Sequence, residues 1–243
     1  MLDFRKSISL LDMSGMYGEE GFSPDGAMYL DFRELEGTRC LCDGSALSAL
    51  RSALAPLPPG GIHWIDGGDW HYLSLLWMER IREPFRLVLI DNHSDDQPVS
   101  LGDILGCGSW VLHARRSLPL MVSDCWIRDA VQPEREAAGA GARRCAAAER
   151  DAAEDATPVY ISIDLDALSR EHARTNWDQG GMSLKSLLEL VRRISERSRI
   201  IGVDVCGGIT PDQGGSAEDL RINLRTRMAI QEFLLSLQNQ TIH

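Results

Sequence analysis

The sequence has no apolar run of the roughly 18 residues that a helix needs to span a bilayer. Its first twenty residues also lack the long apolar segment and small-residue cleavage site of a secretion signal. We therefore expect a cytoplasmic protein with no membrane partner.

Positive charge is scarce in this chain. It has 25 Lys and Arg residues against 36 Asp and Glu residues, which gives a formal net charge of −11 at pH 7. Such a surface repels the phosphate backbone of nucleic acids, so we expect no nucleic-acid partner. A small-molecule partner is the better expectation.

The cysteines form no C-x-x-C pair, although the chain has six of them. In a chain of this size, scattered cysteines indicate reduced thiols that pack as small buried residues. Cys107 and Cys206 have no basic neighbour in the sequence that would activate them, so we expect both to be inert.

Short apolar runs recur along the 243 residues, and each contains or ends in an aspartate. These predicted strands cover residues 7–13, 61–66, 86–91, 119–124, 158–166 and 199–205. Apolar residues at helical spacing predict helices over residues 44–54, 71–81, 184–194 and 217–237. Strands that alternate with helices indicate one α/β domain, residues 1–243, around a mostly parallel sheet.

Two stretches look irregular. Residues 14–45 are rich in glycine and acid, and we expect a surface excursion there. Residues 131–157 consist largely of Ala, Glu, Arg and Gly, which predicts an exposed, partly helical insertion.

The run "RLVLIDNHSDDQP" changes from apolar to acidic where its strand should end. Asp91, His93 and Asp95 lie two residues apart, so in an extended chain they share one face. Open α/β sheets bind ligands just beyond the carboxyl ends of their strands. These three side chains are therefore candidates for a common site.

The same pattern returns in "VYISIDLDALS", where Asp164 and Asp166 follow an apolar strand. His71, in "WIDGGDWHYLS", follows a third strand and a turn that contains two glycines. If these strands are neighbours, six groups meet in one crevice: His71, Asp91, His93, Asp95, Asp164 and Asp166.

The charge of these six groups indicates what they bind. Four carboxylates in one crevice repel one another unless cations neutralise them, and two divalent ions would do so. Carboxylate and imidazole ligands favour Mn²⁺, with Zn²⁺, Fe²⁺ or Co²⁺ as alternatives. Acids at strand ends can also simply cap the following turns, but two such clusters at a spacing of two residues favour a metal site.

The segments "GGDWH", "DNHSD" and "SIDLDAL" resemble, in order, the three metal-binding motifs of the ureohydrolases, the arginase and agmatinase group. The resemblance continues through "GGMSLKSLLEL" and "IIGVDVCGGITP" and covers roughly residues 60–212. It implies a three-layer α/β/α sandwich, an arginase-like fold. It also implies a binuclear manganese site, hydrolysis of guanidino compounds to urea and a possible homo-oligomer.

The sequence departs from this family at three positions. Trp70 occupies the family's metal-binding histidine position, so either His71 replaces that ligand through a shifted turn or one metal position is lost. Cys107 stands where the family has a histidine for proton transfer, and Gly207 stands near its guanidinium-binding glutamate. Asp204 is retained.

The resulting hypothesis is a metal-dependent hydrolase of a C–N bond in a guanidino or amidino compound. Asp95 is predicted to be both a metal ligand and the acceptor of the proton from the attacking water. Asp204 is predicted to act behind the ligands or on the substrate, and Trp177 to close over the substrate. Two alternatives remain open: a single-metal amide hydrolase or deacetylase, and a metal-binding scaffold without activity.

Overall fold

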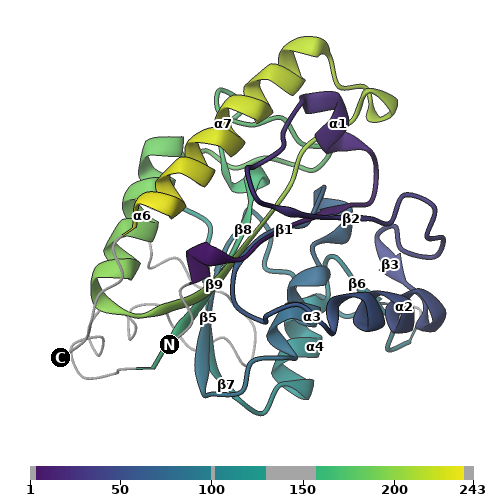
Figure 1. Cartoon of the computed structure of the whole chain (residues 1–243), viewed down its shortest axis with the longest axis vertical. Coiled ribbons are helices and arrows are strands. Elements are labelled where there is room, and N and C mark those ends of the chain that lie inside the picture. The colour runs from purple at the N-terminus through teal and green to yellow at the C-terminus, as the bar shows by residue number, and fades with distance from the viewer. Residues whose placement is uncertain (1–3, 100–101, 130–156, 238–243) are drawn as a thin grey trace.

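A computed structural model describes residues 4–99, 102–129 and 157–237. Its centre is a seven-stranded sheet in which every neighbouring pair is parallel, in the order β2-β1-β4-β9-β8-β5-β7 (Figure 1). The strands are β1 (Ile8–Asp12), β2 (Met28–Asp31), β4 (Ile62–Trp64), β5 (Phe85–Ile90), β7 (Met121–Ile127), β8 (Val159–Asp164) and β9 (Ile200–Cys206). A separate antiparallel pair joins β3 (Leu41–Cys42) to β6 (Leu105–Gly106).

Helices cover both faces of this sheet. They are α1 (Met16–Glu20), α2 (Gly44–Leu54), α3 (Leu73–Met78), α4 (Trp110–Ser117), α6 (Leu184–Arg197) and α7 (Ala217–Ser236). Four short 3₁₀ helices lie between them: η1 (Phe4–Lys6), η2 (Gly68–Trp70), η3 (Leu165–Ala167) and η4 (Pro211–Gln213).

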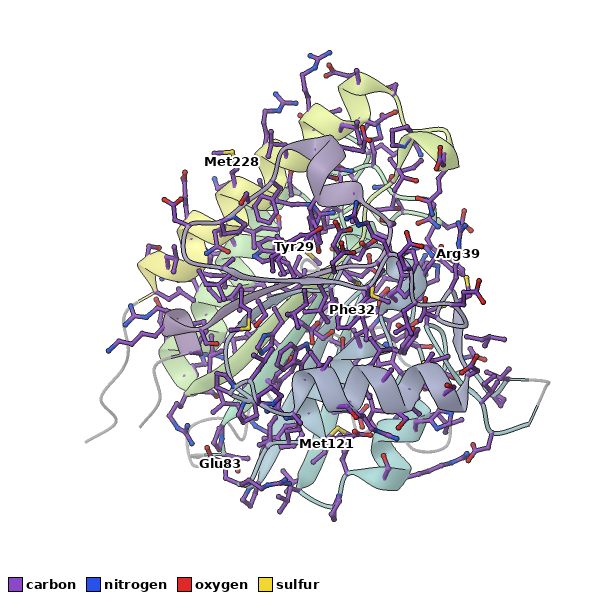
Figure 2. All side chains as sticks on the ribbon, turned by 45° about the vertical axis from the view of Figure 1, so that its right-hand side comes forward. Tyr29, Phe32, Arg39, Glu83, Met121 and Met228 are labelled. Atoms are coloured by element: carbon purple, nitrogen blue, oxygen red, sulfur yellow. The ribbon has the colours of Figure 1, made fainter. Side chains whose placement is uncertain are left out.

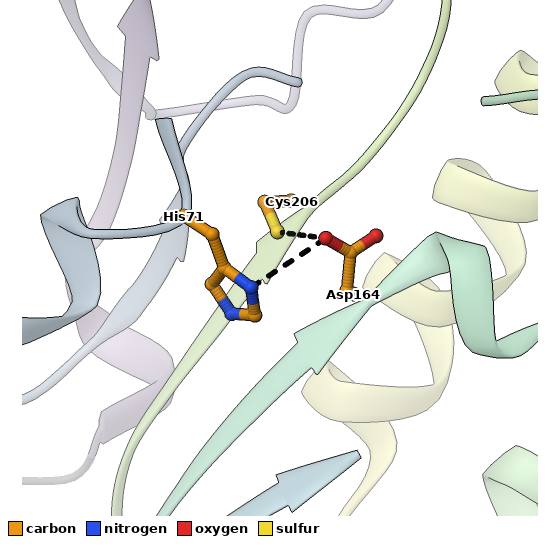
Figure 3. A group of neighbouring side chains, drawn as sticks. All are labelled: His71, Asp164 and Cys206. Carbon is orange, nitrogen blue, oxygen red and sulfur yellow. Dashed lines mark hydrogen bonds and ion pairs between the residues drawn. The ribbon is translucent and has the colours of Figure 1, made fainter. Parts of the chain in front are cut away.

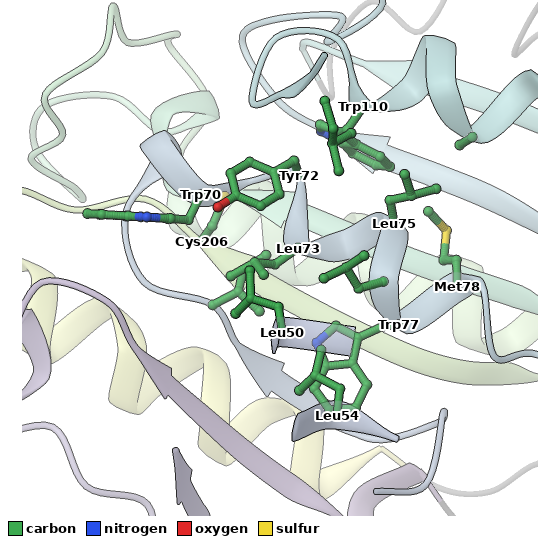
Figure 4. Close-up of a cluster of buried hydrophobic side chains, with 14 of the residues drawn as sticks. Leu50, Leu54, Trp70, Tyr72, Leu73, Leu75, Trp77, Met78, Trp110 and Cys206 are labelled. Atoms are coloured by element: carbon green, nitrogen blue, oxygen red, sulfur yellow. The ribbon is translucent and has the colours of Figure 1, made fainter. Parts of the chain in front are cut away.

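Two apolar cores define the three layers. Leu87 and Leu89 of β5 pack in one core with α2, α3 and α4, which Figure 4 shows around Trp77 and Trp110. Val203 and Val205 of β9 point the other way, into the core formed with α1, α6 and α7. The fold is therefore the three-layer α/β/α sandwich, arginase-like, that the sequence predicted.

The main helices begin at residues that accept hydrogen bonds from free backbone N–H groups. Asp43 accepts from the backbone of Ala46 at the start of α2. Ser216 and Asp219 form a reciprocal capping box at the start of α7. These caps fix where each helix leaves its preceding loop.

All six predicted strands are present, with ends shifted by a few residues. Many residues of segment 14–45 are exposed, as predicted for a surface excursion, but the segment is less irregular than predicted. This segment contributes α1, the parallel edge strand β2 and strand β3. In Figure 2, Tyr29 and Phe32 mark this edge, where Tyr29 donates a hydrogen bond to Asp12 on the neighbouring strand.

Two further expectations need correction. The helix predicted over residues 71–81 is shorter, because η2 ends at Trp70 and α3 spans only Leu73–Met78. The expectation of reduced thiols holds for Cys40, Cys42, Cys107 and Cys206 but is wrong for Cys125, which is disulfide-bonded.

The predicted insertion at 131–157 lies, apart from its last residue, outside the described residues. Among the described helices, none has both the length and the apolar character needed to cross a membrane.

Candidate metal centre

The carboxyl ends of the parallel strands surround a cavity of about 210 Å³. Its wall includes all six residues for which the sequence predicts a metal role: His71, Asp91, His93, Asp95, Asp164 and Asp166. Asp164 ends β8, and the other five lie in the segments that follow β4, β5 and β8. Because these strands are all parallel, their loops emerge at the same edge of the sheet.

One group of side chains surrounds the imidazole of His71. Its Nδ1 lies 3.2 Å from Asp91 Oδ2, 3.0 Å from Asp95 Oδ2 and 3.5 Å from Asp164 Oδ2. All four side chains are almost fully buried. We call this group the inner cluster.

A second group lies nearer the solvent. His93 Nδ1 is 2.8 Å from Asp166 Oδ2 and 3.6 Å from Asp91 Oδ1. The His93 side chain is 38% exposed, whereas both carboxylates are buried. Asp91 takes part in both groups, one carboxylate oxygen in each, so this outer cluster adjoins the inner one.

The route of the chain through these residues differs from the extended geometry that the sequence predicted. Asp95 has a φ of +49°, a left-handed conformation that turns its side chain back toward His71. Asp166 lies in η3, and its backbone N–H donates to Asp164 Oδ1 at 2.8 Å. Tight turns, rather than one face of a strand, therefore bring the acids together.

The structure also shows how His71 reaches the inner cluster although Trp70 precedes it in the sequence. Trp70 ends the 3₁₀ turn η2 and is buried, with its indole N–H donating to Thr38 Oγ1 at 3.1 Å. His71, one residue later, points at the carboxylates instead. Of the two alternatives raised by the displaced histidine, this geometry agrees with the shifted turn.

Asp204 lies behind the cavity rather than in its wall. His71 Nε2 contacts Ser162 Oγ at 2.9 Å, and Ser162 Oγ donates to Asp204 Oδ1 at 2.6 Å. Asp204 is fully buried on β9, which does not agree with a direct substrate contact. Its position instead suits a residue that orients the imidazole of His71.

The aromatic ring of Trp177 lies at the mouth of the cavity. It is 39% exposed, and its centroid is 5.9 Å from that of His93 in an edge-on arrangement. Its indole N–H donates to Asp69 Oδ1 at 2.9 Å. Asp69 also accepts hydrogen bonds from Arg39, Asn176 and Gln213.

The buried carboxyl groups of the two clusters have too few positively charged neighbours, and their pKa values are raised. Burial, reinforced by the neighbouring acids, raises the pKa of Asp164 to about 6 and that of Asp166 to about 7. Burial likewise raises the pKa values of Asp91 and Asp95. Hydrogen bonds to Asp166 and Asp91 raise the pKa of His93 to about 10.

This arrangement fits divalent cations. Asp91 Oδ2 is buried and accepts no hydrogen bond from any described residue. Each cluster supplies at least three ligand atoms within 4.8 Å of one another, and carboxylate with imidazole is a common donor set for first-row divalent ions. Cations would supply the positive charge that four buried carboxylates lack.

Cys206, which the sequence predicted to be an inert buried thiol, contacts the inner cluster. The thiol ends β9 opposite Asp164, and its Sγ donates to Asp164 Oδ2 at 3.0 Å. Figure 3 shows the thiol and His71 both contacting the same oxygen of that carboxylate. The available signal was the spacing of Asp204 and Cys206, two residues apart at a strand end, as in the Asp164–Asp166 pair.

The fold and the clustered ligands define an arginase-fold protein with a candidate metal centre at the carboxyl edge of its sheet. A sequence model of the Arginase family matches residues 130–217. An uncharacterized protein from Thermotoga maritima is 28% identical over 209 residues, which cover 84% of this chain and 80% of that protein.

Solved structures with the same fold include an amidino hydrolase and a formimidoylglutamase. Proclavaminate amidino hydrolase from Streptomyces clavuligerus aligns with a TM-score of 0.64 and 16% identity, over 96% of this chain and 92% of that one. Formimidoylglutamase from Bacillus subtilis aligns with a TM-score of 0.65 and 12% identity, over 94% and 86%. The chain therefore shares the arginase-like fold of these enzymes at low sequence identity.

Proposed function

We propose that this protein is a binuclear metal-dependent hydrolase that cleaves a C–N bond of a small guanidino or amidino compound. The observation that supports the proposal most directly is the convergence of two imidazoles and four buried carboxylates on one cavity. The resemblance to hydrolases named for amidino and formimidoyl substrates supports the bond type.

In this proposal the inner position is held by His71, Asp91, Asp95 and Asp164, and the outer position by Asp91, His93 and Asp166. Bound divalent ions would supply Lewis acidity and an activated water, and Mn²⁺ is the ion that the sequence resemblance implies. The protein's own part is to fix these ligands and to accept the proton that the water loses.

Asp95 is the proposed proton acceptor. Its Oδ2 lies 3.0 Å from His71 Nδ1 and accepts a hydrogen bond from Trp110 Nε1 at 2.6 Å, which fixes the carboxylate in place. Its other oxygen remains for the reaction, and the residue lines the cavity. A base held in hydrogen-bonding range of the water contributes about 10²- to 10⁴-fold to the rate.

Trp177 is the proposed substrate contact. Guanidinium and amidinium groups are planar cations, which bind favourably to the face of an indole. The ring lies at the cavity mouth and beside His93. This contact would take over part of the recognition that the family's glutamate supplies.

The test combines metal content with turnover. Purified protein is loaded with Mn²⁺ and with Zn²⁺, its metal is counted by elemental analysis, and urea or ammonia release is measured on a panel of guanidino and amidino compounds. We expect about two ions per chain, and a fall in turnover of at least ~100-fold for Asp95→Asn.

Asp96→Asn is the matched control. Asp96 is the adjacent carboxylate, but it pairs with Arg115 at 2.9 Å and does not line the cavity. Its substitution should leave metal content and turnover close to those of the wild type. Full metal content and full turnover in Asp95→Asn would contradict the role given to Asp95.

A second candidate function is hydrolysis of a neutral amide. Every carboxylate among the described residues that line the cavity belongs to the two clusters, so none is left to bind a substrate cation. Release of acetate or formate from amide compounds, with a single tightly bound Zn²⁺ per chain, would favour this reaction.

A further inference from the structure

Among the described residues, Cys206 has the one thiol that donates a hydrogen bond to a member of the inner cluster. It lies at the end of β9, paired in register with Asp164 at the end of β8. Both strands are central in the sheet, so neighbouring strands fix both backbones on either side.

One atom each from His71, Asp164 and Cys206 lies within 4.8 Å of the other two, so small shifts would bring all three onto one ion. Cys206 Sγ is 3.0 Å from Asp164 Oδ2, and His71 Nδ1 is 3.5 Å from the same oxygen (Figure 3). Sulfur, nitrogen and oxygen ligands of one tetrahedral zinc ion lie roughly 3.4–3.6 Å apart, given the usual metal–ligand bond lengths. All three side chains are at least 97% buried.

A second observation points to a ligand at the same place. Asp91 Oδ2, 3.2 Å from His71 Nδ1, is buried and accepts no hydrogen bond from the described residues. An acceptor left bare beside an imidazole, a carboxylate and a thiol is what an ion would satisfy.

We propose that Cys206 is a thiolate ligand of the inner metal position, together with His71 and Asp164, and that this position therefore selects zinc, cobalt or ferrous iron over manganese. The inference rests on the proposed metal function and deepens it by naming the metal class. Soft thiolate ligands favour zinc, whereas Mn²⁺ prefers carboxylate, carbonyl and water.

Binding at this position releases the thiol proton to solvent, because only the thiolate is a metal ligand. The Cys206 Sγ–H bond breaks and a sulfur–metal bond forms, with no change in oxidation state. The hydrogen bond from Sγ to Asp164 is lost in the same step, and that carboxylate oxygen becomes free to bind the ion as well.

Cobalt provides a direct spectroscopic test. Co²⁺ is added stepwise to the full-length metal-free protein while its visible and near-ultraviolet absorption is recorded. A cobalt ion bound to a thiolate gives a sulfur-to-cobalt charge-transfer band, which oxygen and nitrogen ligands alone do not give. We expect this band in the wild type, reaching its maximum as the first ion binds.

Cys206→Ser should abolish the band and weaken zinc binding by on the order of 100-fold or more, since even the loss of an outer hydrogen-bond partner costs 10- to 100-fold at such sites. Its Mn²⁺ affinity should change by less than about 10-fold, because manganese gains little from sulfur. Cys107→Ser is the matched control, since Cys107 also lines the cavity but is absent from the clusters of possible ligands.

The outcomes separate this inference from the proposed function. Cobalt that binds without the charge-transfer band, or a band that persists in Cys206→Ser, overturns the thiolate ligand and leaves the metal site intact. Failure of the wild type to bind any Co²⁺, Zn²⁺ or Mn²⁺ overturns both. The wild-type spectrum alone decides the matter if the variant does not fold.

Discussion

Gly207 occupies a point in the structure where no side chain fits. Its φ is +97°, and a Cβ built on it would lie 2.6 Å from Asp164 Oδ1 and 2.9 Å from Leu165. The family's guanidinium-binding glutamate has its counterpart near this residue. The positive φ and the close contacts therefore disfavour a glutamate, or any other side chain, at position 207.

Gly207→Ala should lower both stability and metal content. A left-handed backbone costs a non-glycine residue about 1–3 kcal/mol, and the contact with Asp164 adds to that cost by displacing a proposed ligand. Gly214→Ala is the matched control, because Gly214 has a φ of +93° but open space around its Cβ position. Urea unfolding and elemental analysis of both variants measure the difference.

We expect the two alanine variants to lose similar amounts of free energy from the backbone alone, while only Gly207→Ala loses bound metal. Equal metal content in both would mean that Asp164 tolerates displacement and is not essential to the site.

At the residue scale, the sequence predicted which side chains lie close together, but not the backbone turns that bring them there. The strand-end spacing of Asp91, His93 and Asp95 correctly predicted a shared location, because parallel strands bring such ends to one edge. The left-handed turn at Asp95 was not predictable, since no glycine or proline marks it. The contact of Cys206 with Asp164 was not predicted, because no basic residue near Cys206 in the sequence marks its thiol as reactive.

At the element scale, Arg227 connects α7 to α1 and to the loop after β9. Its Nε donates to Glu20 at 2.6 Å and its Nη2 to the carbonyl of Gly207 at 2.5 Å, with both side chains buried. The guanidinium also lies 5.2 Å from the ring centroid of Tyr17. The buried guanidinium of Arg227 therefore fixes the loop that begins at Gly207, directly after Cys206.

Arg227→Met should destabilise the protein by about 3–5 kcal/mol, because it leaves the Glu20 carboxylate buried and unpaired. The double variant Glu20→Gln with Arg227→Met should recover at least about 1 kcal/mol of that loss. Urea unfolding of the two single variants and the double variant forms the cycle. Purely additive effects would show that the ion pair itself contributes nothing.

Helices and strands were predictable from the sequence where they carry a clear apolar run or an apolar stripe at helical spacing. The apolar run that became β8 and the helical stripe of α6 were each recovered, since both bury a continuous apolar surface. Edge strand β2 was missed because its side chains are mostly exposed, and exposed strands carry little hydrophobic signal. Helix α4 was missed because it is short and ends in two arginines.

At the scale of the whole molecule, this acidic protein buries the four neighbouring aspartates of the inner and outer clusters. The net charge of the chain is −11, so its surroundings do not offset the repulsion between these carboxylates. The raised pKa values of Asp164 and Asp166 show that their ionisation is unfavourable. A carboxyl group whose pKa is higher in the folded than in the unfolded state binds more protons when folded. Its contribution to stability therefore falls as pH rises.

The metal-free protein should accordingly lose stability between about pH 4, the unfolded pKa of aspartate, and about pH 7, the folded pKa of Asp166. His93 acts in the same direction at higher pH, because its raised pKa of about 10 favours the folded state only while the imidazole is protonated. Divalent metal should reverse this loss.

We expect saturating Zn²⁺ or Mn²⁺ to raise the Tm by roughly 5–10 °C at pH 8, and by much less at pH 5, where protons compete for the ligands. Thermal unfolding followed by circular dichroism at both pH values measures this. An equal rise at both pH values would contradict the assignment of these carboxylates as ligands.

Asp69, the buried carboxylate that accepts the indole N–H of Trp177, joins several segments of the chain beside the cavity. The donors on Arg39, Asn176, Trp177 and Gln213 come from three distant segments, and all end on this one carboxylate. Substitutions at these positions are therefore constrained together, and loop exchange in any one segment must preserve its donor. Ser94 and Gln97 line the same cavity but do not contact Asp69. Substitutions at these two positions would therefore change the cavity lining without disturbing the hydrogen bonds of Asp69.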